Sequence, residues 1–162
     1  MERRSNDPVK TAVRKAKTQR RVGRGAACGD CGESRPETLV ARSRPKRCYA
    51  CYQVARGKKA SEDHHMAGKA NSRVTVDTPA NDHRVLSDAQ YDWPLHVAQN
   101  TDGSPLLALA AALGGIADFI EKLIVRWLRQ GKQLCIDIDE WLREQNGKTW
   151  WVGSPFEGWQ PG

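Results

Sequence analysis

The chain of 162 residues has no long hydrophobic run. Its longest uncharged, apolar-rich stretch covers residues 103–117, which is shorter than the roughly 20 residues that a membrane-spanning helix requires. Residues 1–27 also contain no apolar core of the kind that defines a signal peptide. We therefore expect a cytoplasmic protein without a membrane partner.

Histidine and cysteine are scarce, and most of those present are grouped. Four of the five cysteines form two Cys-x-x-Cys pairs, and three of the four histidines lie within one short segment. Without a secretion signal, paired cysteines do not indicate a disulfide framework. They indicate a metal site in a reducing compartment.

The first pair is Cys28 and Cys31, and the second is Cys48 and Cys51. Two intervening residues let both thiolates of a turn face one ion, and two such turns complete the tetrahedral sulfur set that Zn²⁺ prefers. Four thiolates leave no open coordination position, so the expected zinc is structural. We assign residues 28–60 to this zinc module.

Positive charge is concentrated at the start of the chain. Residues 1–27 carry nine basic and two acidic groups, residues 28–60 carry eight and three, and residues 61–162 carry nine and fourteen. The first segment has too few large apolar side chains to fold alone, so we predict a disordered basic arm over 1–27. The charge pattern favours DNA as a partner; a tail that only improves solubility is the alternative. The expected phosphate contacts here are Arg14, Lys15, Lys17, Arg20, Arg21, Arg24, Lys46 and Arg47.

The histidine-rich segment, residues 61–95, has the pattern of two strands and a helix. Residues 74–76 are β-branched, as expected of a short second strand, and Thr78-Pro79 should end it. Asn81 or Asp82 can cap a helix that continues to about Tyr91. That helix would have His83 in its first turn.

This segment resembles the signature of the HNH endonucleases. The resemblance covers about residues 28 to 93 and is carried by Asp63-His64-His65-Met66-Ala67-Gly68-Lys69-Ala70-Asn71, Val74-Thr75-Val76 and Asn81-Asp82-His83-Arg84. It implies a ββα-metal (His-Me finger) core, in which two strands and a helix hold a metal ion. Pro79-Ala80-Asn81-Asp82-His83 stands where the family has Cys-x-x-Cys-His. The cysteine module is similar to the zinc ribbon that precedes the nuclease core in some phage-type HNH proteins.

Carried over by position, the resemblance implies that His65 is the general base and that His64 and His83 are metal ligands. The ion would be Mg²⁺ or Mn²⁺, although Zn²⁺ also fits. Asn71 is the nearest counterpart of the family residue that orients the base. An alternative assignment makes Asp63 and His64 the ligand and the base.

A third metal ligand is left open among Asp63, Asn81 and Asp88. Lys69 or Arg84 could hold the flanking phosphate. A neutral imidazole suits proton transfer from water, and a divalent ion suits the charge that develops during phosphodiester hydrolysis.

The last third of the chain is predicted to be helical. After a linker over 96–104, Ser104 and Pro105 provide an N-cap and a first-turn proline. Apolar residues then recur at three- and four-residue steps, at Leu106, Leu109, Leu113, Ile116, Ile120, Leu123 and Trp127. This seam predicts a homodimer through residues 105–130, or packing on the protein's own core.

Gly131 should end that helix, and a second helix should cover residues 134–145, within a helical segment spanning 105–147. Residues 148–162 form a tail rich in Trp, Gly and Pro.

The sequence thus predicts an α+β protein with a zinc-ribbon module, a ββα-metal core and a C-terminal helical segment. The function it favours is a metal-dependent DNA endonuclease. The alternatives are a catalytically inactive zinc-ribbon DNA-binding factor and an adaptor in phage assembly.

Overall fold

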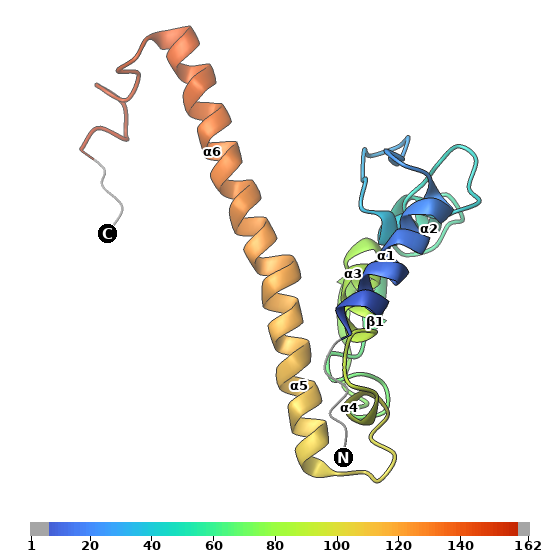
Figure 1. Ribbon diagram of the computed structural model, residues 1–162. Coiled ribbons are helices and arrows are strands. Elements are labelled where there is room, and N and C mark those ends of the chain that lie inside the picture. Colours follow the sequence, from blue (N-terminus) through green and yellow to red (C-terminus); the bar gives the residue numbers. More distant parts are fainter. Residues whose placement is uncertain (1–6, 159–162) are drawn as a thin grey trace. The chain divides into compact units, whose positions relative to one another are not determined.

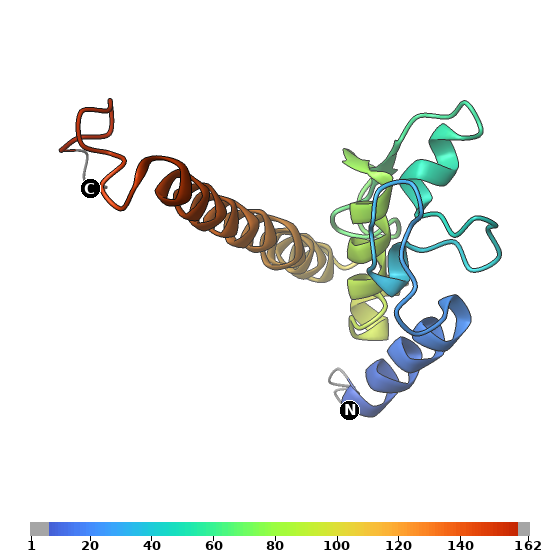
Figure 2. The same cartoon turned by 90° about the horizontal axis from the view of Figure 1, so that it is seen from above.

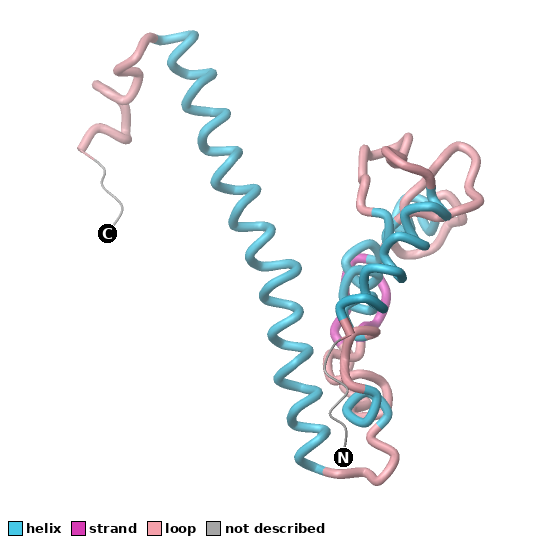
Figure 3. The backbone as a smooth tube through the Cα atoms, viewed as in Figure 1, coloured by secondary structure: helices cyan, strands magenta, loops and turns pink. Residues whose placement is uncertain are grey.

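The computed structural model describes residues 7–158 and divides the chain into two compact units, Met1–Leu123 and Ile124–Gly162 (Figure 1). It is an α+β fold in which helices predominate, as the colouring by secondary structure makes clear (Figure 3). In chain order the elements are α1 (Pro8–Val22), η1 (Pro36–Thr38), α2 (Tyr49–Val54), β1 (Ser61–His64), β2 (Val76–Pro79), α3 (Ala80–Gln90), α4 (Leu95–Gln99), α5 (Pro105–Phe119), η2 (Ile120–Ile124) and α6 (Val125–Asn146).

The sheet is a single antiparallel pair, β1 and β2, with Ser61 opposite Pro79 and His64 opposite Val76. The second strand starts later than predicted, at Val76, and ends at Pro79, where the sequence predicted its end. In a two-stranded sheet each strand has a free edge, so the missing N–H of a proline is tolerated. Helix α3 follows at once, and it contacts both strands.

Helix α3 packs its apolar side inward, with Ala80, Val85 and Leu86 buried. Neither predicted cap residue caps it, because Pro79 occupies the N-cap position and no side chain bonds to the first turn. Asn81 Oδ1 instead accepts a hydrogen bond of 3.0 Å from the backbone N–H of Ala50 in α2. This bond ties the cysteine module to α3.

Residues 8–22 form helix α1, where the sequence predicted a disordered arm; residues 1–6 lie outside the described residues. Asp7 caps the helix by accepting from the N–H groups of Val9 and Lys10. Val22, at its end, is buried together with Cys28, Leu39 and Cys48. The apolar burial that the arm lacks on its own is therefore supplied by tertiary contact.

The predicted linker over 96–104 is shorter than expected, because residues 95–99 form α4. Asn100 then adopts a positive φ of 39° and its Oδ1 accepts from Ser104 N–H at 2.8 Å. Ser104 caps α5 as predicted, with its Oγ 3.5 Å from Leu107 N. Within α5, Gly115 is buried against the backbone of Met66. A Cβ on Gly115 would lie only 1.8 Å from the carbonyl oxygen of Met66. Gly115 thus permits a close backbone approach at Met66.

The second unit is one helix, α6, followed by a tail of turns (Figure 2). The prediction that Gly131 ends a helix was wrong, since α6 continues through it to Asn146 and Gly147 stops it with a φ of 87°. A glycine inside a helix costs only about 1 kcal/mol, which is too little to break one of this length. In the tail, Trp150 Nε1 donates to Asp139 Oδ1 at 2.7 Å, and its ring meets those of Trp151 and Phe156 edge-on. Within residues 7–158, no helix combines the length and apolar character needed to cross a membrane.

Candidate metal and nucleic-acid sites

The four paired cysteines converge on one point. The Sγ atoms of Cys28, Cys31, Cys48 and Cys51 all lie within 4.8 Å of one another, and those of Cys31 and Cys48 are 3.6 Å apart. Four sulfurs around a tetrahedral ion with bonds of about 2.3 Å are roughly 3.8 Å apart. The cluster therefore has the spacing of a metal site and can bind one ion.

Backbone geometry holds the cysteines in place. The turn after Cys28 closes with a 2.9 Å bond from Gly32 N–H to Cys28 O, at a glycine φ of 76°. On the other side, Cys48 pairs with Leu39 in an isolated bridge and is the N-cap of α2, its Sγ facing Cys51 N at 3.5 Å. The cluster is thus formed by two turns. Each turn is fixed by its own backbone hydrogen bonds and contributes two thiols.

The electrostatics of the cluster favour an ion at its centre. Burial raises the pKa of the Cys28 thiol, but N–H groups of Cys48, Asp30 and Cys31 stabilise its thiolate more strongly and lower the pKa to about 7. Burial, followed by the neighbouring thiols, raises the pKa of Cys51. Once one thiol of the cluster is ionised, further thiolates beside it require a cation to offset their negative charge.

Two predicted metal ligands come together at the strand–helix junction. His64 ends β1 and is buried, while His83 lies in the first turn of α3, and their ring centroids are 5.1 Å apart and nearly perpendicular. Burial, followed by the charges of His83 and His65, lowers the pKa of His64 to about 4. Burial also lowers the pKa of His83. Both rings are neutral at pH 7, which is the form that binds metals.

Each ring has a polar neighbour that limits how it can turn. The Gln90 amide nitrogen lies 3.3 Å from His64 Nε2 and donates to His65 O at 2.8 Å. His83 Nδ1 lies 2.9 Å from Glu62 Oε2, but the two are not aligned for a hydrogen bond. Glu62 itself accepts from Arg84 and Gln53.

The ring of His65 is held by a backbone group. Its Nδ1 is 3.0 Å from the carbonyl oxygen of Ser72, which can only accept, so in the neutral imidazole Nδ1 carries the proton and the lone pair is on Nε2. Asn71, predicted to orient the base, donates instead to Val97 O at 2.9 Å, and its buried Oδ1 has no hydrogen-bond partner among residues 7–158. Ser72 therefore fixes the His65 ring.

The predicted third ligand, Asp63, is not beside the histidines. Successive strand residues face opposite sides, so Glu62 and His64 face α3 while Asp63 is exposed. In the described part of the chain, only the cysteine cluster brings three or more His, Cys, Asp or Glu donor atoms close enough to share an ion. The acidic neighbour of His83 is Glu62, which was not among the predicted site residues, although the period of two along the strand could have identified it.

Several predicted phosphate contacts are engaged within the protein. Arg14 forms ion pairs with Asp88 and Asp92, and Arg84 binds Glu62 and stacks 4.1 Å from the centre of the Tyr49 ring. In the cysteine module, Lys46 Nζ donates to Ala41 O at 2.7 Å and Arg47 Nε to Asp30 at 2.8 Å. The predicted contacts that are exposed are Lys15, Lys17, Arg20, Arg21, Arg24 and Lys69.

Two further arginines are exposed on the loop of the cysteine module that precedes its second pair. Arg42 and Arg44 are close to Lys46 in the chain, and both are exposed. The ammonium group of Lys46 closes this loop by donating to the carbonyl oxygens of Val40 and Ala41. They were not among the predicted phosphate contacts. Their exposure makes them better placed for a polyanion than Lys46 and Arg47.

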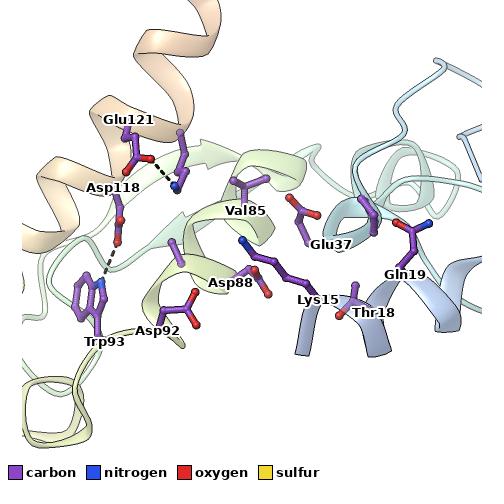
Figure 4. Close-up of a pocket in the computed structure, with 13 residues that line it drawn as sticks. Lys15, Thr18, Gln19, Glu37, Val85, Asp88, Asp92, Trp93, Asp118 and Glu121 are labelled. Carbon is purple, nitrogen blue, oxygen red and sulfur yellow. Dashed lines mark hydrogen bonds and ion pairs between the residues drawn. The ribbon is translucent and has the colours of Figure 1, made fainter. Parts of the chain in front are cut away.

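A cavity of about 550 Å³ lies among α1, α3 and α5, and it is acidic (Figure 4). Trp93 Nε1 donates to Asp118 at 2.9 Å on one wall, and burial raises the pKa of that aspartate despite this bond. The acidic groups of its lining are Glu37, Asp88, Asp92, Asp118 and Glu121, against Lys15 and Lys122. Such a lining repels a phosphate backbone, and none of the histidines contributes to it.

No family model, curated protein or solved structure matches this chain.

Proposed function

We propose that this protein is a metal-dependent DNA endonuclease of the HNH type. The observation that carries the proposal is the arrangement of three histidines on one strand–strand–helix element. His64 ends β1, His65 follows it directly, and His83 lies in the first turn of α3. The Nε2 atom of His65 is free of any bond to Ser72.

His65 is the general base in this proposal. Because Ser72 accepts the Nδ1 proton, the Nε2 atom can take a proton from a water molecule that attacks phosphorus. His64 and His83 are the residues that would hold a divalent ion, and both are neutral at pH 7 as metal binding requires. That ion, when bound, would stabilise charge on the phosphate and the leaving oxygen.

Glu62 acts as a positioning residue for His83. A carboxylate that accepts the N–H of a metal-binding histidine orients the ring and raises its basicity; Glu62 Oε2 lies within reach of His83 Nδ1, at 2.9 Å, and would accept from it once the ring turns into line. Glu62 is itself fixed by Arg84 and Gln53.

The cysteine cluster, in this proposal, binds a structural Zn²⁺ ion. Four thiols at this spacing match the ligand set that Zn²⁺ prefers and leave no position for a substrate. Its role would be to present basic groups to DNA, which a protein of net charge +7 attracts through its phosphates.

The test is cleavage of supercoiled plasmid in the presence of Mg²⁺, Mn²⁺ or Zn²⁺. We expect wild type to relax or linearise the plasmid and His65→Ala to lose about 10²–10⁴ in rate, the usual worth of base catalysis. His96→Ala is the matched control, because His96 is exposed on α4. Full activity in His65→Ala would refute the role of this residue.

A second candidate function is a DNA-binding factor without nuclease activity. The observation in its favour is that Asp63 is exposed on the far side of β1 and that no third acidic or histidine donor among residues 7–158 joins His64 and His83. Plasmid binding without cleavage under every divalent ion would support this function and refute the endonuclease.

A further inference from the structure

Helix α6 exposes a continuous apolar stripe. The stripe consists of Trp127 (47% exposed), Leu134 (58%), Ile138 (47%) and Trp141 (58%). No residue of α6 is buried. The steps between them are seven, four and three residues, which places all four on one side of a helix. Ile136, also exposed, falls on the opposite side.

A helix of 22 residues with such a stripe requires a covering surface. In proteins, most of the stability of a helix comes from packing its apolar face against another surface. Contiguous exposed apolar patches on proteins usually mark interaction sites. What covers the stripe can be inferred from the charges beside it.

The charges of α6 are divided between its two halves. Residues 125–135 contain three basic groups and no acidic group, and residues 136–146 contain four acidic groups and one basic group. The bulky residues of the stripe are arranged symmetrically, with Trp127 and Trp141 each seven residues from Leu134. A surface with these properties is complementary to itself after a two-fold rotation.

We propose that α6 pairs in an antiparallel orientation with α6 of a second copy of this chain, around a two-fold axis near Leu134. Trp127 of each copy then lies opposite Trp141 of the other, and each basic half lies beside an acidic half. A parallel pair would place like charges side by side, which is unfavourable. In this arrangement the dimer contact is centred on residues 125–146, and it overlaps the predicted seam over 105–130 at Trp127.

Two smaller residues fit this arrangement. Gly131 lies in the stripe between Trp127 and Leu134, and apart from the backbone of its own helix no atom lies within 4 Å of where its Cβ would be, which leaves room for a bulky side chain of the partner. Cys135 is exposed at the edge of the stripe, next to the proposed axis. The Cys135 thiols of two paired copies should therefore be close together.

The first test compares two substitutions on the same helix in the full-length chain. Leu134→Lys should convert the dimer to a monomer across the micromolar range, as measured by sedimentation or by light scattering after size exclusion. Ile136→Lys, on the opposite side, should leave the dimer unchanged. Because the readout is mass, this test is independent of whether the protein cleaves DNA. A monomeric wild type, or equal effects of both changes, would overturn the proposal.

The second test addresses orientation through charge. Reversing the acidic half with Asp137→Lys, Glu140→Lys and Glu144→Lys should weaken the dimer at least tenfold. Adding Arg129→Glu and Lys132→Glu to the same chain should restore it, because the two halves are then complementary again. A dimer that does not respond to the first set, or that the second set fails to restore, would exclude the antiparallel pairing.

A third measurement locates the axis. A short bismaleimide should cross-link two wild-type chains through Cys135, and Cys135→Ser should remove the cross-linked band while leaving the mass of the dimer unchanged. A band that persists in Cys135→Ser would place the contact elsewhere.

Discussion

The cysteine cluster and the histidine cluster are both candidate ion sites, but they are built differently. Each half of the cysteine cluster is formed by one local turn, and the four sulfur atoms already lie at the spacing of a tetrahedral ion. The histidine cluster depends on a strand packing against a helix, and it brings only two rings together, 5.1 Å apart.

This difference indicates different requirements at the two sites. A structural ion is best held by a complete, closed set of protein donors, whereas a catalytic ion needs open positions for water and substrate. The histidine cluster offers only two ring donors, and its rings are surrounded by buried structure and by neighbouring side chains such as Gln90 and Glu62. The cysteine site should therefore dominate stability, and the histidine site should respond to pH and to local packing.

The largest expected effect follows from removing one thiol. Cys48→Ser should abolish stoichiometric zinc in the purified protein and unfold the module over residues 28–60. Structural zinc contributes roughly 10–16 kcal/mol in small zinc-binding peptides, so we expect a loss of several kcal/mol in the full chain. Zinc content by mass spectrometry and the thermal midpoint measure both effects.

Cys135→Ser is the matched control for this change, because Cys135 is exposed in the second unit and far along the chain from the cluster. Zinc content should be unchanged in that variant. Loss of zinc from both variants would contradict the four-cysteine site.

The next largest effect concerns His64 and pH. Its pKa is about 4 in the folded chain against 6.5 in the unfolded chain, so the unfolded state binds more protons between these values. Stability is therefore complete above pH 6.5 and falls as the pH drops toward 4, by about 3 kcal/mol at 1.36 kcal/mol per pKa unit.

Urea denaturation at several pH values measures this slope. His64→Gln removes the titrating group and should flatten the profile over this window, although its stability at pH 7 will also be lower. His96→Gln, an exposed position, should keep the wild-type profile. An unchanged slope in His64→Gln would show that the ring is not buried as a neutral group.

A smaller effect is expected where α5 meets the loop that carries His65. Gly115→Ala would place a methyl group 1.8 Å from the Met66 carbonyl oxygen, so the backbone next to His65 has to move. We expect a loss of about 1–3 kcal/mol, typical of overpacking, together with reduced plasmid cleavage. Gly114→Ala is the control, because its Cβ would meet the Trp93 ring at 3.6 Å, an ordinary contact. Equal thermal midpoints for the two variants would mean that the close approach at Met66 does not exist.

The parts that could be predicted from the sequence are those with a local physical cause. The cysteine spacing alone indicates a shared ion, and Ser104-Pro105 alone indicates the start of α5. The helix predicted to continue to about Tyr91 is likewise present as α3, which ends at Gln90.

The parts that could not be predicted depend on contacts between distant residues. Helix α1 is stabilised where Arg14 meets Asp88 and Asp92, 74 and 78 positions away. The same pairs remove Arg14 from the set of groups available to DNA. The composition of residues 1–27 does not reveal such ion pairs, which is why the sequence predicted a disordered arm.

The smallest expected effect concerns which basic groups of the cysteine module face solvent. Arg42→Ala with Arg44→Ala removes two exposed charges, so the slope of log affinity for DNA against log salt should fall by about 0.9 for each phosphate that is no longer neutralised. Lys46→Ala with Arg47→Ala removes groups that bind Ala41 O and Asp30, and it should lower the thermal midpoint while leaving the salt slope close to wild type. The two cases are separated by measuring the affinity for labelled duplex DNA by fluorescence anisotropy at roughly 50 to 200 mM salt. Affinity that depends on phosphate neutralisation falls steeply over this range. The reverse pattern would mean that the loop opens on DNA and releases Lys46 and Arg47, and that the cysteine module is less rigid than its four-sulfur geometry implies.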